Sequence, residues 1–267
     1  MNFDNFAPEH EQPLEQFVAN GGFCSIFRRI GCIGDSLSSG EFESVSPTGE
    51  VEYHDFYDYS WGQFLGRLCG SNVNNFSRGG MTAREYCQSF AQEQGFWNPE
   101  LRCQAYFLAL GVNDLFYAPY EFGGSDDICL SDWRQNRQTF AGCYAQIIQR
   151  LQSIEPRAHF FLITIPRSDE AAEREALADR HQALLREMTG LFPNCWLLDL
   201  RRFAPIYDSD FRRRFYLGGH MNPCGYVLTA KMISSYVDYI IRHNIAQFAE
   251  TGFIGTPYRF GSGKTDV

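Results

Sequence analysis

The chain has 267 residues, of which 44% are hydrophobic and 21% charged, so it can bury a large core and shows no sign of disorder or a fibrous repeat. Its formal net charge of −9 and isoelectric point near 5.2 predict a surface that repels phosphate backbones and anionic lipid headgroups. Nucleic acid is therefore not expected as a partner, and no apolar run is long enough to span a membrane.

The N-terminal segment does not resemble a secretion signal. Asp4, Glu9, Glu11 and Glu15 fall within the first 25 residues, which contain no Lys or Arg, whereas a signal begins with a basic region. The nine cysteines are scattered and form no C-x-x-C pair, so neither a disulfide framework nor a zinc site is indicated. These features predict a cytoplasmic protein with buried thiols; the alternative is a lost or non-classical export signal.

Short apolar runs alternate with longer helical patterns along the chain. The runs predict five strands, near residues 29–33, 73–76, 105–110, 159–165 and 195–198. Residues 105–110 are apolar without alternation, as expected for a strand covered by helices on both faces. Strands that alternate with helices in this way predict an α/β fold built around a mostly parallel sheet.

Two helices are predicted from their caps and apolar spacing. We expect Asp132 to cap a helix whose apolar face is formed by Phe140, Tyr144, Ile147, Ile148 and Leu151. A second helix is predicted to begin near Ser168 or Asp169, with Gly190 just past its end.

A third helix is predicted after Asn222, which suits an N-cap, with Pro223 in the first turn. Neither a repeat nor a linker interrupts residues 25–245, so we expect one domain over residues 1–267 with its core in that range. The segments before about residue 22 and after about residue 244 look irregular. Their aromatic residues favour arms that pack on the domain or on a second copy of the chain, in a homo-oligomer.

Four short segments carry side chains suited to acyl transfer. Residues 34–37 read Gly-Asp-Ser-Leu at the end of the first predicted strand, where α/β sheets gather functional groups. Residues 75–82 follow the second strand, residues 110–114 read Leu-Gly-Val-Asn-Asp after the third, and residues 218–223 carry a histidine before the last helix. Alone, Gly-Asp-Ser is equally compatible with an ordinary turn.

In this order and spacing, the four segments resemble the sequence blocks of the SGNH (GDSL-type) hydrolases, over about residues 29–243. The resemblance implies a flavodoxin-like three-layer α/β/α fold with about five parallel strands, and hydrolysis of an ester or related acyl bond. It places the nucleophile at Ser36, its base at His220, and an oxyanion hole at the backbone N–H groups of Ser36 and Gly80 and the amide of Asn113. Acyl transfer requires such a nucleophile, base and set of donors, and no metal or cofactor is expected.

One position departs from the family pattern. The aspartate expected three residues before the histidine is replaced by Leu217. Asp208 or Asp210 on the preceding loop, a backbone carbonyl near Leu217, or no third member at all are the alternatives for what orients His220. The missing aspartate also leaves open a non-catalytic binding module on the same fold.

Aromatic residues cluster at positions 53–61, after the nucleophile segment. Tyr57 and Trp61 are candidates for lining a substrate pocket by stacking on a sugar ring; the alternative is that the cluster begins the next helix and packs inward. We hypothesise a serine esterase that removes a short acyl group, such as acetyl, from a carbohydrate or another small polar alcohol. A lysophospholipase or thioesterase acting on a lipid ester is the rival hypothesis.

Overall fold

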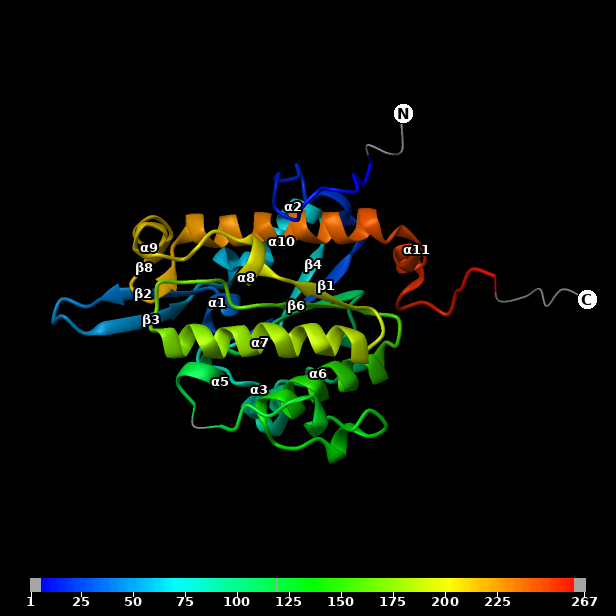
Figure 1. Cartoon of the computed structure of the whole chain (residues 1–267), viewed down its shortest axis with the longest axis horizontal. Coiled ribbons are helices and arrows are strands. Elements are labelled where there is room, and N and C mark those ends of the chain that lie inside the picture. Colours follow the sequence, from blue (N-terminus) through cyan, green and yellow to red (C-terminus); the bar gives the residue numbers. More distant parts are fainter. Residues whose placement is uncertain (1–5, 119, 262–267) are drawn as a thin grey trace, which may run out of the picture.

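The computed structural model describes residues 6–118 and 120–261, which form a three-layer α/β/α fold (Figure 1). A five-stranded parallel sheet occupies the middle layer, in the order β4-β1-β5-β6-β7. Its strands are β1 (Arg29–Gly34), β4 (Asn72–Asn75), β5 (Ala105–Ala109), β6 (His159–Ile163) and β7 (Cys195–Leu198). All five predicted strands are confirmed, with shifts of one or two residues at some ends.

Helices cover both faces of the sheet (Figure 1). One apolar core packs α2 and α10 on one face, and a second packs α3, α6 and α7 on the other. The helices are α1 (Ser36–Ser39), α2 (Trp61–Cys69), α3 (Ala83–Glu85), α4 (Ala91–Glu93), α5 (Val112–Phe116), α6 (Phe140–Ile154), α7 (Ala172–Leu191), α8 (Leu200–Phe203), α9 (Ser209–Phe215), α10 (Pro223–His243) and α11 (Ile245–Phe248).

Of the four predicted helix ends, one is confirmed and three lie at other residues. α6 begins at Thr139, whose hydroxyl accepts a hydrogen bond from the N–H of Gly142, while Asp132 caps only the short turn before it. α7 begins at Ala172, three residues after the predicted Asp169, and continues through Gly190 instead of stopping before it. The third prediction is confirmed, because Asn222 caps α10 by accepting from the N–H of Gly225.

A β-hairpin that the sequence did not predict follows α1. β2 (Glu41–Val45) and β3 (Val51–Asp55) pair antiparallel and project from the end of the domain core at which β1 terminates (Figure 1). In their register Glu43 lies opposite Tyr53 and Glu41 lies opposite Asp55. Because side chains alternate along a strand, these four share one face of the hairpin.

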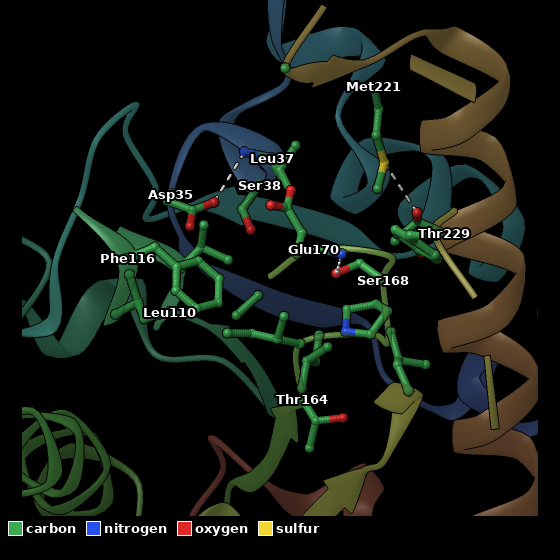
Figure 2. A pocket seen from close by; sticks show the side chains of 18 of the residues that line it. Asp35, Leu37, Ser38, Leu110, Phe116, Thr164, Ser168, Glu170, Met221 and Thr229 are labelled. Atoms are coloured by element: carbon green, nitrogen blue, oxygen red, sulfur yellow. Dashed lines mark hydrogen bonds between the residues drawn. The ribbon is translucent and has the colours of Figure 1, made fainter. Parts of the chain in front are cut away.

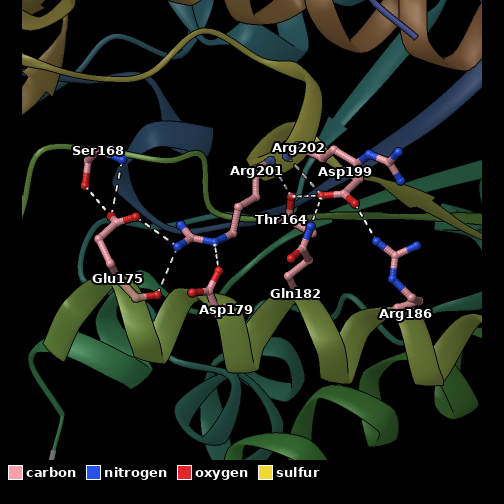
Figure 3. Close-up of polar contacts among 9 residues, drawn as sticks. All are labelled: Thr164, Ser168, Glu175, Asp179, Gln182, Arg186, Asp199, Arg201 and Arg202. Atoms are coloured by element: carbon pink, nitrogen blue, oxygen red, sulfur yellow. Dashed lines mark hydrogen bonds and ion pairs between the residues drawn. The ribbon is translucent and has the colours of Figure 1, made fainter. Parts of the chain in front are cut away.

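A buried polar network ties α7 to the segments that follow β6 and β7 (Figure 3). Arg201 is only 3% exposed, and its guanidinium contacts Asp179 at 2.6 Å and Glu175 at 2.9 Å. A buried charge requires such partners. Glu175 also accepts a hydrogen bond from the Ser168 hydroxyl at 2.7 Å, so the network fixes the loop after β6 against α7.

The described parts of the two terminal arms pack on the same chain. Glu11 pairs with Arg242 of α10 at 2.7 Å, and the carbonyl of Thr256 accepts from Arg157 at 2.7 Å. These contacts match the first of the two predicted roles for the arms, packing on the domain. Within residues 6–118 and 120–261, no helix combines the length and apolarity needed to cross a membrane.

Candidate active site

Ser36 lies where β1 ends at the carboxyl edge of the sheet. Asp35 caps α1 by accepting from the N–H of Leu37 at 3.1 Å, so Ser36 is the first residue of this one-turn helix and is half-buried. α1 packs against the short strand β9 (His220–Met221), which pairs with β8 (Tyr216–Leu217). The structure therefore brings the Ser36 and His220 segments together from opposite ends of the sequence.

The segments that follow β4 and β5 are joined to each other beside β1. The amide nitrogen of Asn113 donates to the carbonyl of Met81 at 3.1 Å, and Asp114 accepts from the N–H of Ala83 at 2.9 Å. Gly80 precedes Met81 and is exposed with a φ of 70°, a conformation that favours glycine. Gly80 and Asn113 therefore lie in segments that hydrogen bonds hold together, next to the end of β1.

Two buried carboxyl groups support these turns. Burial raises the pKa of Asp114 to about 7, against the opposing effect of the hydrogen bond from Ala83. Burial likewise raises the pKa of Asp35 to about 6, although the N–H of Leu37 favours its charged form. Both groups thus favour the protonated state more strongly in the folded chain than in the unfolded chain.

The raised pKa of Asp114 predicts a pH-dependent cost to stability. A carboxyl whose folded pKa lies above its unfolded value stabilises the fold at low pH, and this stabilisation is lost as the pH rises through about 7. Asp114→Asn keeps an acceptor for the N–H of Ala83 but carries no charge. We therefore expect its free energy of unfolding, relative to wild type, to increase by roughly 2 kcal/mol between pH 5 and pH 8.

Urea unfolding of both proteins at the two pH values measures this difference. Asp35 is buried in both proteins, so the effect of its burial cancels, whereas its charge acts on Asp114 only in wild type. A difference between Asp114→Asn and wild type that does not change with pH would show that Asp114 is not protonated in the native state at low pH.

His220 lies between two carboxylates of the hairpin. Its Nδ1 is hydrogen-bonded to Glu43 Oε1 at 2.7 Å, and its Nε2 lies 3.0 Å from Glu41 Oε1. The ring of Tyr53 packs edge-on against the imidazole, with 5.6 Å between ring centroids. Glu41, Glu43 and Tyr53, which contact the imidazole, thus all lie on one face of the hairpin.

The predicted acids Asp208 and Asp210 were the wrong choice for contact with His220. Asp208 caps α9 by accepting from the N–H of Phe211 at 2.9 Å, and Asp210 pairs with Arg213. Sequence reasoning missed Glu41 and Glu43 instead. The only signal was their spacing of two, which places both on one side of a strand once that strand is recognised.

Glu41 reaches across the site from β2. Besides facing Nε2 of His220, its carboxylate lies against the backbone of Gly79, in the segment that precedes Gly80. Burial raises the pKa of Glu41, His220 opposes this rise, and the charges of Asp55 and Glu43 add to it. Among the described residues, no hydrogen bond joins the Ser36 hydroxyl to His220.

A cavity of about 210 Å³ adjoins the nucleophile segment. Leu37, Leu110 and Phe116 contribute to its apolar lining (Figure 2). Trp61 also contributes, but it begins α2 and is only 2% exposed, which matches the alternative that it packs inward. Tyr57, the other predicted pocket residue, is not part of this lining; its hydroxyl instead donates to the carbonyl of Val73 at 3.4 Å, on the β4 side.

The cavity also has polar lining residues. Ser168, Glu170 and Arg174 line it, with 3.4 Å between the charged groups of Glu170 and Arg174. Apolar side chains thus line the cavity together with these polar groups, and two of its lining residues, Asp35 and Leu37, flank Ser36 in the sequence.

A model of the GDSL-like lipase/acylhydrolase family matches residues 32–228 of the chain. This range includes the segments of Ser36, Gly80, Asn113 and His220, as well as the β2–β3 hairpin. The comparison with curated proteins found no match.

Several solved structures share the fold at low sequence identity. A family 2 carbohydrate esterase from Corynascus thermopiles (Myceliophthora fergusii) is 16% identical with a TM-score of 0.55, over 84% of this chain and 67% of that one. A family 2 carbohydrate esterase from Clostridium thermocellum is 14% identical with a TM-score of 0.53, over 82% and 65%. An acetyl xylan esterase is 18% identical with a TM-score of 0.50, over 78% and 99%. The chain spans about two thirds of the length of the first two.

Proposed function

The chain belongs to the GDSL-like lipase/acylhydrolase family, and from this premise we propose that it hydrolyses a carboxylic ester with Ser36 as nucleophile and His220 as base. The observation that carries the proposal is the meeting of four separate segments at one sheet edge. Ser36 follows β1 as the first residue of α1, the His220 segment packs on α1, and Asn113 is hydrogen-bonded to the segment of Gly80.

The reaction would proceed in two acyl-transfer steps. The Ser36 hydroxyl attacks the ester carbon while Nε2 of His220 takes its proton, and the imidazolium then returns that proton to the departing alcohol. Water repeats the sequence on the acyl-enzyme and releases the acid. Both steps require the lone pair of Nε2 to face Ser36, so Glu41, which lies 3.0 Å from Nε2, must give way to the hydroxyl.

The oxygen of each tetrahedral intermediate needs hydrogen-bond donors. Three donors would serve: the backbone N–H groups of Ser36 and Gly80 and one N–H of the Asn113 side-chain amide. The other N–H of that amide donates to the carbonyl of Met81 and so holds the amide in place. A Cβ built on Gly80 would meet nothing within 4 Å. An ester carbonyl can therefore approach the backbone of Gly80 without a clash.

The two sides of the ester would meet different surroundings. The apolar cavity beside Ser36 suits the acyl chain, and its volume of about 210 Å³ limits the length of that chain. On the His220 side the ring of Tyr53 is 59% exposed, which suits stacking against a sugar or another polar alcohol. We therefore propose a short acyl group, such as acetyl, on a carbohydrate or similar alcohol.

A lipid esterase is the second candidate, and the apolar lining of the cavity favours it. Rates of hydrolysis for p-nitrophenyl esters of increasing acyl length separate the two. A preference for short acyl groups predicts a steep fall in kcat/KM beyond about four carbons. A rise toward long chains would favour the lipid esterase, whereas no hydrolysis of any ester by the folded protein would support a binding module instead.

A further inference from the structure

We infer that Glu43 is the positioning residue for His220, in place of the aspartate that is absent at Leu217. The inference rests on the proposed function, because it assigns a role within the same site. The acid would thus come from a hairpin that follows the nucleophile, instead of from the loop that carries the histidine.

Glu43 contacts His220 directly. Glu43 Oε1 accepts hydrogen bonds from Nδ1 of His220 and from the N–H of Gly219, both at 2.7 Å. The side chains of Glu43 and His220 are 17% and 14% exposed. This shielding from water makes the charge-assisted hydrogen bond stronger than an exposed one.

The histidine loop leaves room for this carboxylate. Gly218 has a φ of 66°, and a Cβ at this position would collide with Glu43 Oε2. A Cβ on Gly219 would lie 2.7 Å from Oε1. Two consecutive glycines therefore let Glu43 approach His220, while Leu217, at the usual position of the acid, is 49% exposed.

The hairpin that carries Glu43 is fixed at its base. The hydroxyl of Tyr226 in α10 donates to the carbonyl of Glu41, and the hydroxyl of Ser39 donates to Asp55, each at 2.7 Å. Phe42 packs against the ring of Tyr226 on the opposite face, with 5.5 Å between centroids. A carboxylate on a fixed strand can hold an imidazole in one orientation.

The choice between Glu43 and Glu41 follows from the nitrogen that each one contacts. A base must keep its proton on one nitrogen and present the lone pair of the other to the nucleophile. Glu43 holds the proton at Nδ1 and would stabilise the imidazolium formed during the reaction. Glu41 lies beside Nε2, so it competes with Ser36 for this nitrogen.

Glu43→Gln tests the inference without removing the side chain. We expect kcat for p-nitrophenyl acetate to fall by about 10²–10⁴-fold with KM changed by less than about threefold, because a neutral amide stabilises the imidazolium poorly. Glu43→Asp retains a carboxylate and should recover part of this loss. Glu52→Gln is the matched control, since it removes the same charge from the hairpin at a position opposite Ser44, away from His220.

The proton spectrum of the ring gives a readout that does not depend on activity. We expect a downfield Nδ1–H resonance of His220 in wild type that moves upfield or disappears in Glu43→Gln but persists in Glu52→Gln. A resonance insensitive to Glu43→Gln would overturn the inference, even for a protein without esterase activity.

The kinetic outcomes separate the inference from the proposed function. Hydrolysis that requires Ser36 but survives Glu43→Gln within about threefold would overturn the inference alone. A larger loss of kcat in Glu41→Gln than in Glu43→Gln would also overturn it, because the acid at Nε2 would then be the essential one. If the wild-type protein hydrolyses no ester, the proposed function is overturned. The role of Glu43 is then tested by the Nδ1–H resonance of His220 alone.

Discussion

Replacing Ser36 or His220 by alanine will lower kcat for ester hydrolysis by about 10⁴–10⁶-fold, and replacing both will cost little more than replacing one. The two side chains act as one unit, since the hydroxyl is a weak nucleophile unless the imidazole takes its proton. The residual rate of every variant reflects substrate binding and the oxyanion donors alone.

Steady-state kinetics of the two single variants and the double variant measure this effect. Ser153→Ala is a suitable control, because Ser153 is exposed on α6 and bonds only the local carbonyl of Arg150 at 2.6 Å. Losses that multiply in the double variant would contradict the account, since they would mean that Ser36 and His220 act independently.

Replacing Asn113 by alanine will lower kcat by about 10²–10³-fold while changing KM by less than about threefold. The amide would donate to the oxygen only when this oxygen becomes negative, so its loss affects the transition state more than the bound ester. The variant also loses the hydrogen bond to Met81, which should cost about 1 kcal/mol of stability.

Asn98→Ala separates the catalytic loss from the structural one. Asn98 accepts from the N–H of Glu100 at 3.0 Å in an exposed turn, so its replacement removes a comparable local hydrogen bond at a distant site. Kinetics and thermal melting of both variants provide the comparison. An Asn113→Ala variant whose kcat stays close to that of Asn98→Ala would remove Asn113 from the oxyanion hole.

The sheet could be predicted because its strands are apolar on both faces. Residues 105–109, for example, lie in the middle of the sheet between β1 and β6, and burial by helices on both sides leaves no place for polar alternation. The β2–β3 hairpin could not be predicted in this way. Its side chains are largely acidic or aromatic, and several, such as Val45 and Val51, are exposed, so no continuous apolar face marks its strands.

The candidate site likewise contains residues that could be predicted from the sequence and residues that could not. Ser36, Gly80 and Asn113 follow strands whose carboxyl ends must meet in a parallel sheet, so the motifs alone indicate their neighbourhood. Glu43 lies 177 residues from His220 in the sequence and reaches it only through the hairpin. Asp208 and Asp210 lie closer to His220 in the sequence, but Asp208 caps α9 and Asp210 pairs with Arg213.

The central claim is that Ser36 is an activated nucleophile, and covalent labelling tests it most directly. The folded protein should be treated with a fluorophosphonate probe and digested, and the modified peptide identified by mass spectrometry. We predict a phosphonyl adduct on Ser36 that is absent from Ser36→Ala and strongly reduced in His220→Ala. A well-folded wild-type protein that stays unlabelled, or an adduct on another residue, would contradict the account.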